Sequence, residues 1–166
     1  ATKTTLNSGL ISSTSAAAYG VGDLYINGQS IIDTTTLRDS LNNAKTATAR
    51  TALLISAINK DATKTATGVV ATAVGATGYK LTAADGRNID ITSGRTSATG
   101  AASALGFDVY GANSSGVGGT AVRQYGNLSL SSTKEITIGG TVTGGGLKAG
   151  SYGTSFVGGE VALSYA

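Results

Sequence analysis

The fold of this chain is organised around the stretch Gly22-Asp23-Leu24-Tyr25-Ile26-Asn27-Gly28-Gln29-Ser30-Ile31-Ile32. It holds two short apolar runs separated by an Asn-Gly pair. Because both residues of such a pair tolerate positive φ, Asn-Gly between apolar runs is the strongest local signal for a β-hairpin. We therefore predict a hairpin over residues 19–32, which sets strand register ahead of the next segment.

The segment after this hairpin has helical character. Residues 33–36 offer side-chain oxygens that can cap a helix N-terminus. Apolar residues then recur at helical spacing, namely Leu37, Leu41, Ala44, Leu54, Ile55 and Ile58. Residues 45–51 are small and polar, so one long helix and two shorter helices both fit. We predict one main helix over about residues 34–62, with a break or slip near 45–48, packed on a sheet.

From Gly68 onward apolar and polar residues alternate, which is the period of a β-strand. Strands are expected at residues 70–74, 79–83, 89–91, 105–110, 128–130, 136–138 and 161–163. Within residues 1–18, an edge strand and disorder of the first few residues both fit. We place hairpin turns at Asp85-Gly86, at 131–134 and at Gly139-Gly140, the last leading into Val142. Residues 93–104 are expected to be a loop or weak helix, and 111–120 a loop with a further break at 144–146.

These elements predict an α+β fold of mostly antiparallel β-hairpins with one main helix packed on a sheet. With 166 residues, the chain is expected to be a single domain. A division into two subdomains, about 19–92 and about 93–166, is the alternative. No apolar run approaches the length of about 20 residues that a membrane span needs.

The composition excludes most familiar catalytic sites. The sequence has no Cys and no His, so it has neither a thiol nucleophile nor a Ser-His-Asp triad. It also lacks the residues that usually bind zinc, copper or haem. The net charge of +3 comes from basic residues scattered along the chain, whereas nucleic-acid binders cluster them with aromatic residues. We expect no catalytic, cofactor-binding or metal-binding residue, no cofactor, and no nucleic-acid or membrane partner.

Several short segments together resemble the repeated Ile-Asn motif of bacterial flagellins. They are Leu24-Tyr25-Ile26-Asn27-Gly28, Leu54-Ile55-Ser56-Ala57-Ile58-Asn59, Thr67-Gly68-Val69-Val70-Ala71, Tyr79-Lys80-Leu81-Thr82-Ala83-Ala84-Asp85-Gly86 and Ile89-Asp90-Ile91. Tyr125-Gly126-Asn127-Leu128-Ser129-Leu130-Ser131-Ser132 is similar to a stretch found late in flagellin variable regions. Each match is short, but their order and spacing make the set specific.

The resemblance implies the outer, surface-exposed domain of a flagellar filament subunit, secreted and extracellular. Neighbouring filament subunits and antibodies are the partners that it implies. The sequence departs from whole flagellins because it shows no sustained heptads of the kind that build long core helices. We therefore expect a fragment that lacks the polymerising segments and is monomeric in isolation. If it is an insertion between core helices, Ala1 and Ala166 should lie close together.

Several candidate sites have a simpler structural interpretation. Asp85, Asn88 and Asp90 are close enough to suggest calcium ligands, but their spacing is not that of an EF-hand loop. The glycines at 139–140 and 144–146, the latter followed by Leu147-Lys148, lack the Gly-Lys-Ser/Thr of a phosphate-binding loop. Asn113 and Asn127 begin N-glycosylation patterns that carry little weight in a bacterial chain. We favour turns and bends for these segments.

Three other functions are weighed against the structural one. A glycosidase needs two facing carboxylates, and its candidates are Asp23, Asp33, Asp39, Asp61, Asp85, Asp90, Asp108, Glu135 and Glu160. A carbohydrate-binding or adhesive β-module would use some of the seven tyrosines as stacking platforms. A filament cap or hook-associated protein would carry the same motif as the filament subunit.

Overall fold

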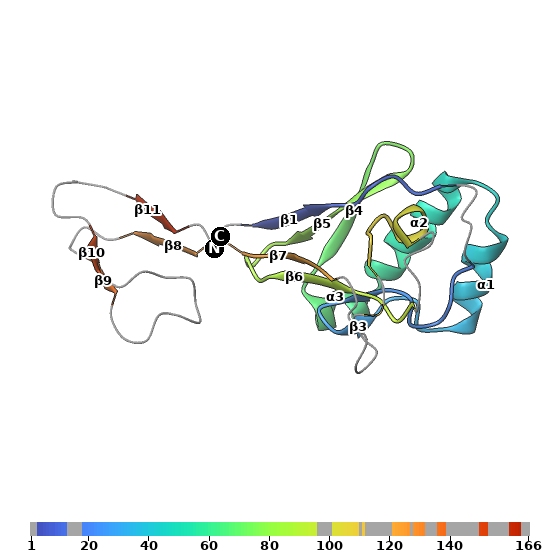
Figure 1. Cartoon of the computed structure of the whole chain (residues 1–166), viewed down its shortest axis with the longest axis horizontal. Helices are drawn as coiled ribbons and strands as arrows, with labels where there is room; N and C mark the ends of the chain where they lie inside the picture. Colours follow the sequence, from blue (N-terminus) through green and yellow to red (C-terminus); the bar gives the residue numbers. More distant parts are fainter. Residues whose placement is uncertain are drawn as a thin grey trace.

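The computed structural model describes residues 3–12, 18–95, 101–109, 111, 121–126, 128–131, 136–138, 150–152 and 160–163. From residue 128 onward only the backbone elements are described. Within these ranges lie the helices α1 (Thr35–Asn43), α2 (Ala47–Ile58), α3 (Asp61–Thr67) and α4 (Ala101–Leu105). Figure 1 shows these helices at one end, the longer strands beside them, and the last four strands at the other end.

The strands form antiparallel ladders. They are β1 (Thr4–Asn7), β2 (Tyr25–Ile26), β3 (Gln29–Ser30), β4 (Val70–Val74), β5 (Gly78–Ala83), β6 (Ile89–Thr92), β7 (Val122–Gln124), β8 (Leu128–Ser131), β9 (Ile136–Ile138), β10 (Gly150–Tyr152) and β11 (Glu160–Leu163). One sheet has the order β1-β5-β4, another has the order β3-β2-β6-β7, and two further pairs are β10-β9 and β11-β8. The predicted α+β class is confirmed, as is the edge strand near the start, which is β1.

The opening hairpin is present with the predicted turn. Asn27 has φ of 49° and Gly28 has φ of 79°, which is the pair of positive values that a two-residue type I′ turn requires. β2 and β3 flank it, with Tyr25 opposite Ser30 and Ile26 opposite Gln29. β2 also pairs with β6, so the hairpin is part of the four-stranded sheet.

The single main helix predicted over 34–62 is wrong, because the segment forms three helices. The expected break near 45–48 lies at Ala44–Thr46, where Ala44 is extended and the Thr46 hydroxyl caps α2 by accepting the Ala49 N–H at 3.1 Å. A second break follows at Asn59-Lys60, and α3 continues beyond the predicted end to Thr67. Asn59 is the C-cap of α2, and its side chain bonds strand β4.

The hairpin predicted at Asp85-Gly86 is also wrong, although a turn is present there. β5 and β6, which flank this turn, belong to different sheets and do not pair. β5 pairs with β1 on one side and with β4 on the other, with Val74 opposite Gly78, so the hairpin lies one strand earlier, around Gly75. Turn residues fix a local reversal but not which strands pair across it.

Two predictions in the later part of the chain are corrected as well. The strand expected over 105–110 is absent in residues 105–109, since α4 ends at Leu105 and Gly106 has φ of 78°. The pairing expected between 128–130 and 136–138 does not form either. β8 pairs with β11 and β9 pairs with β10, because short strands with the same alternation carry little information about their partners. The closing strand 161–163 is present as β11.

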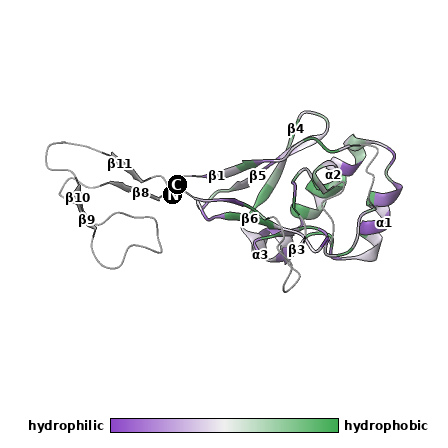
Figure 2. Ribbon diagram, viewed as in Figure 1, coloured by the Kyte–Doolittle hydropathy of each residue, from purple (hydrophilic) through white to green (hydrophobic). Residues whose placement is uncertain are grey.

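Among the described residues, a hydrophobic cluster fills the space between the helices and the two larger sheets. Its members include Leu24, Ile26, Leu41, Leu54, Ile58, Tyr79, Leu81, Ile89, Ile91, Leu105 and Val109. Figure 2 shows hydrophobic colour on α2 and on parts of β4 and β6, whereas the outer helix α1 is mainly hydrophilic. α2 covers β4 and β5, which agrees with the expectation of a helix packed on a sheet.

The cluster and one sheet extend across residue 92, where the alternative division into two subdomains would place its boundary. α4 contributes Ala104 and Leu105 to the cluster, and β7 pairs with β6. The division into two subdomains stays a prediction. Ala1, Ala166, the stretches 112–120 and 139–149, and both N-glycosylation asparagines lie outside the described residues.

Candidate functional site

Two Ile-Asn pairs, Ile26-Asn27 and Ile58-Asn59, occupy equivalent roles in the fold. Ile26 and Ile58 are both fully buried in the hydrophobic cluster. The asparagine after each of them turns back and bonds the main chain of another segment. We call Asn27 and Asn59, with the backbone groups that they bond, the asparagine clamps.

The first clamp joins the hairpin to two distant segments. The Asn27 side-chain oxygen Oδ1 accepts the Asp90 N–H at 2.9 Å, and its Nδ2 donates to the Thr67 carbonyl at 2.8 Å. Asp90 lies in β6 and Thr67 ends α3. One amide side chain therefore connects the β2–β3 turn, a neighbouring strand and the end of a helix.

The second clamp joins α2 to the edge of a sheet. Asn59 Nδ2 donates to the Ala71 carbonyl at 2.8 Å, and Asn59 Oδ1 accepts the Ala71 N–H at 2.8 Å. β4 is an edge strand, and alternate residues of such a strand direct both backbone groups away from the partner. Ala71 is buried, so without Asn59 its two polar groups would lack a partner.

The Thr67-Gly68 part of the motif receives a third contact. Gly68 has φ of 69° and caps the C-terminus of α3. A Cβ at Gly68 would overlap the Arg87 guanidinium, and Arg87 Nη1 donates to the Thr67 carbonyl at 3.3 Å. A cation at a helix C-terminus is favourable, so Arg87 and Asn27 together satisfy the end of α3.

A buried ion pair lies on the other side of the hairpin. Arg95 Nη1 donates to Asp23 Oδ2 at 2.7 Å, and the side chains of the two residues are only 8% and 13% exposed. The Gly20 N–H also donates to Asp23 Oδ2 at 2.7 Å, and the Ser93 hydroxyl donates to the Asp23 carbonyl at 2.6 Å. We call Asp23, Arg95, Ser93 and Gly20 the charged corner.

Burial dominates the ionisation of this corner. It raises the pKa of the Asp23 carboxyl, although the Gly20 N–H and the Arg95 guanidinium act in the opposite direction. Taking a carboxylate out of water disfavours its charged form more than these partners favour it. The charged corner therefore connects the hairpin to the chain after β6, but the desolvation of the Asp23 carboxylate opposes this connection.

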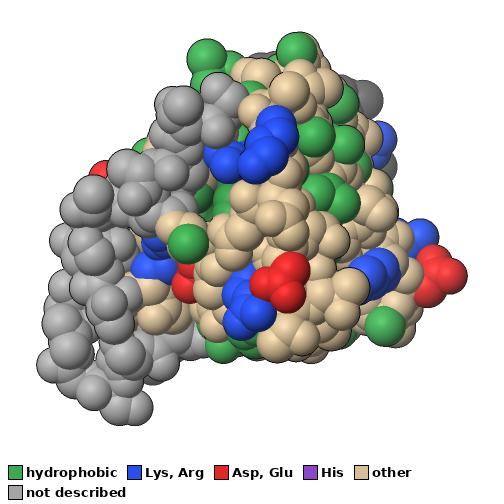
Figure 3. All heavy atoms as spheres, turned by 90° about the vertical axis from the view of Figure 1, so that its right-hand side faces the viewer, with side chains coloured by type: hydrophobic (Ala, Val, Ile, Leu, Met, Phe, Trp, Pro, Cys, Tyr) green, Lys and Arg blue, Asp and Glu red, His purple; other side chains and the backbone are tan. Residues whose placement is uncertain are grey.

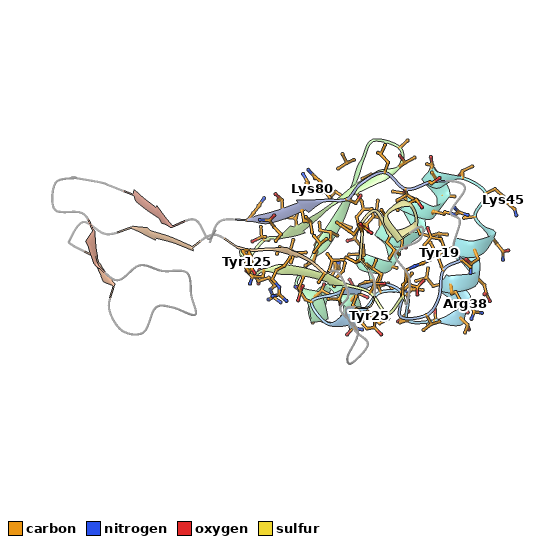
Figure 4. The ribbon with its side chains drawn as sticks, in the orientation of Figure 1. Tyr19, Tyr25, Arg38, Lys45, Lys80 and Tyr125 are labelled. Atoms are coloured by element: carbon orange, nitrogen blue, oxygen red, sulfur yellow. The ribbon has the colours of Figure 1, made fainter. Side chains whose placement is uncertain are left out.

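Tyr19 lies beside the charged corner and is equally buried. Its hydroxyl donates to the Ala104 carbonyl at 2.7 Å, its ring lies 5.8 Å from the Arg50 guanidinium, and burial raises its pKa to about 12. The Asn42 side chain bonds both the N–H and the carbonyl of Tyr19. Figure 4 shows Tyr19 inside the helical end, whereas Arg38 and Lys45 point outward.

The three residues considered as calcium ligands bond different partners. Asp85 binds Arg87, with a pKa lowered mainly by the hydrogen bond from that side chain. Asp90 binds Arg123 at 2.7 Å, and Asn88 Oδ1 accepts the Gly126 N–H at 2.8 Å. Among the described residues, no group of three or more acidic, His or Cys side chains is placed to hold a metal ion.

The carboxylates considered for a glycosidase lie mostly in ion pairs with basic side chains. The pairs are Asp23–Arg95, Asp33–Lys60, Asp39–Arg38, Asp61–Lys64, Asp85–Arg87 and Asp90–Arg123. Asp108 is exposed. Glu135 lies outside the described residues, and the side chain of Glu160 is not described. These six carboxylates therefore each have a basic partner in the part of the chain that the structure describes.

Few of the seven tyrosines are open to a ligand in the described part of the chain. Tyr19 and Tyr79 are buried, and the Tyr79 hydroxyl donates to the Leu105 carbonyl at 2.6 Å. Tyr25 is half-buried, and Tyr125 is exposed at the end of the sheets distant from the helices (Figure 4). Tyr110 and Tyr165 lie outside the described residues, and the Tyr152 side chain is not described.

The surface of the helical end carries separated charges. Figure 3 shows Lys and Arg side chains in several small groups, with acidic side chains beside some of them. In the part of the chain that the structure describes, no helix has both the length and the apolar character needed to cross a bilayer.

No protein-family model matches the sequence, and no curated protein matches it significantly.

Sequence reasoning found the segments of the clamps but not their contacts. The repetition of Ile-Asn at residues 26–27 and 58–59 was the available signal for Asn59. The charged corner had no such signal, because Asp23 and Arg95 are 72 residues apart. In the sequence alone, these two charged residues cannot be distinguished from ordinary surface residues.

Proposed function

We propose that this chain is a structural module, the outer and surface-exposed domain of a bacterial flagellin, which acts through its surface and not through a reaction. The observation that supports this proposal is that side-chain hydrogen bonds connect the motif segments to one another. Asn27 of the first segment bonds Thr67 of the third, and Asn59 of the second bonds Ala71 of the third. These segments resemble flagellin in their order, and they depend on one another in the fold.

The chemistry of the described residues favours the same proposal. Acidic side chains are engaged by basic ones, and the most buried polar groups bond the main chain. Such interactions hold neighbouring segments in place and leave the outer surface free to vary. A domain displayed on a filament requires stability and solubility more than a cleft.

Immunogold labelling of cells from the source bacterium tests this proposal. Antibodies are raised against the folded chain, and their specificity is checked by absorbing a control sample with the same chain. We expect label along the whole length of the flagellar filaments, because each subunit displays one outer domain. Absorbed antibodies should leave the filaments bare.

The position of the label separates the alternatives. Label confined to the filament tip would favour a cap protein, and label confined to the hook junction a hook-associated protein. Unlabelled filaments would remove the proposal altogether. In that case, specific and saturable binding on a glycan array would favour the adhesive β-module.

A further inference from the structure

Asn27-Gly28 combines a chemically labile sequence with a restrained conformation. Asn27 is the only one of the eight asparagines that is followed by glycine. A glycine at this position leaves the following amide nitrogen unhindered by a side chain. Gly28 is exposed, and a Cβ built on it would meet nothing within 4 Å, so water reaches this part of the turn.

We propose that Asn27 is a site of spontaneous deamidation whose reaction the first asparagine clamp suppresses in the folded chain. The Gly28 amide nitrogen attacks Asn27 Cγ and forms a new C–N bond. The Cγ–Nδ2 bond breaks, and ammonia leaves with the proton from the Gly28 nitrogen. Water then opens the resulting succinimide at either carbonyl and gives aspartate or isoaspartate. The only co-reactant is water.

The clamp opposes the first of these steps. Attack requires Cγ to rotate toward the Gly28 nitrogen. In the folded chain Oδ1 is held by the Asp90 N–H and Nδ2 by the Thr67 carbonyl, at 2.9 and 2.8 Å. Both bonds must break before the side chain can rotate, and the two partners lie in separate elements. Reaction therefore waits for the hairpin to open.

The products do not fit the site that produced them. An aspartate at position 27 has no N–H to donate to the Thr67 carbonyl. An isoaspartate adds a methylene to the main chain within a two-residue turn, and this changes the register of β2 with β3. Since β2 also pairs with β6, the four-stranded sheet loses its central contacts. The reaction thus converts transient unfolding into a permanent change.

Peptide mass spectrometry of the full chain tests the proposal. The chain is incubated at mildly alkaline pH, folded in buffer or unfolded in urea, and deamidation is localised to residues by fragmentation. Asn7-Ser8 serves as an internal reference. In urea, we expect Asn27 to deamidate faster than any other asparagine of the chain. In the folded chain its deamidation rate should be lower by a factor of about ten or more, because only the open fraction reacts. Equal rates in the two conditions, or a stable Asn27 in urea, would overturn the proposal.

Two further measurements secure the assignment. The variant Asn27→Gln, which forms the cyclic intermediate far more slowly, should leave the hairpin peptide unmodified in urea, and this control does not require folding. After urea is removed, chains with isoaspartate at position 27 should concentrate in the protease-sensitive fraction. Equal recovery of protease resistance by modified and unmodified chains would overturn the claim that the product does not fit.

Discussion

The first asparagine clamp and the charged corner both hold the opening hairpin, but the clamps and the corner rely on different interactions. Asn27 and Asn59 are neutral amides, each of which supplies one donor and one acceptor to backbone groups. The charged corner removes a carboxylate and a guanidinium from water to make a similar connection. A neutral amide loses little when buried with both bonds made, whereas a buried ion pair carries a large desolvation cost.

This difference teaches where the fold is tolerant and where it is not. A clamp that loses its side chain leaves neutral backbone groups without partners, and water can replace part of the loss. A corner that loses one partner leaves an uncompensated buried charge. We therefore expect the loss of one partner in the charged corner to destabilise the fold more than the loss of one clamp side chain.

The largest effect is expected from Asp23→Ala. Among the described residues, it leaves the buried Arg95 guanidinium with the long 3.4 Å bond to the Ala18 carbonyl. Removing one partner of a buried ion pair costs about 3–5 kcal/mol, and urea denaturation followed by circular dichroism measures the loss. The matched control is Asp39→Ala, which breaks an exposed Asp–Arg pair and should cost at most about 1 kcal/mol. Similar losses in both variants would contradict a special role for the charged corner.

The second largest effect is expected from Asn59→Ala. Both backbone groups of the buried Ala71 lose their partners, and each unsatisfied group costs about 1–3 kcal/mol. Because β4 is an edge strand, water should recover part of this, so we expect a loss of about 2–3 kcal/mol in the same measurement. The control is Asn43→Ala at the exposed end of α1, which should change stability by less than about 0.5 kcal/mol. A negligible loss for Asn59→Ala would remove the second clamp from the fold.

A smaller effect separates the two clamps from each other. Asn27 has φ of 49°, whereas Asn59 has φ of −85°. Asn27→Gly and Asn27→Ala lose the same two side-chain bonds, but alanine also takes on the strain of a left-handed conformation, about 1–2 kcal/mol. We therefore expect the alanine variant to be less stable than the glycine variant by about that amount.

The same pair of substitutions at Asn59 should show no such preference. Alanine tolerates the backbone conformation at this position, and glycine adds flexibility to the unfolded chain. Asn59→Gly should thus be no more stable than Asn59→Ala. A glycine advantage at both positions, or at neither, would show that the turn conformation is not what distinguishes the two clamps.

The elements that could be predicted from sequence are those whose signals are local. Asn27-Gly28 carries its own conformational preference, and the alternation in β4 and β5 spans enough residues to show the strand period. The pairing of β5 with β4, and not with β6, depends on which sheet each strand joins, and the Asp85-Gly86 turn says nothing of that.

The missed contacts depend on residues that meet only in the folded chain. The Asn59 side chain bonds both backbone groups of Ala71, and a helix pattern alone does not show this contact. Arg95 becomes a buried cation because the chain after β6 returns to Asp23. Long-range contacts of this kind decide the candidate site, and they leave no periodic trace in the sequence.

The smallest predicted effect is the response of the two regions to pH. Burial raises the pKa of Asp23 above its ordinary value of 3.8, so the folded chain holds a proton there more tightly than the unfolded chain. The stability that this group contributes is fully present below pH 3.8 and is lost as pH rises through the folded-state pKa. Urea denaturation between pH 7 and pH 3.8 should therefore show wild type gaining stability relative to Asp23→Asn on acidification.

The difference in stability between wild type and Asn59→Ala should stay constant over the same range, because neither the amide nor its backbone partners titrate. A constant difference for Asp23→Asn, or a drift for Asn59→Ala, would contradict the distinction between a charged corner and neutral clamps.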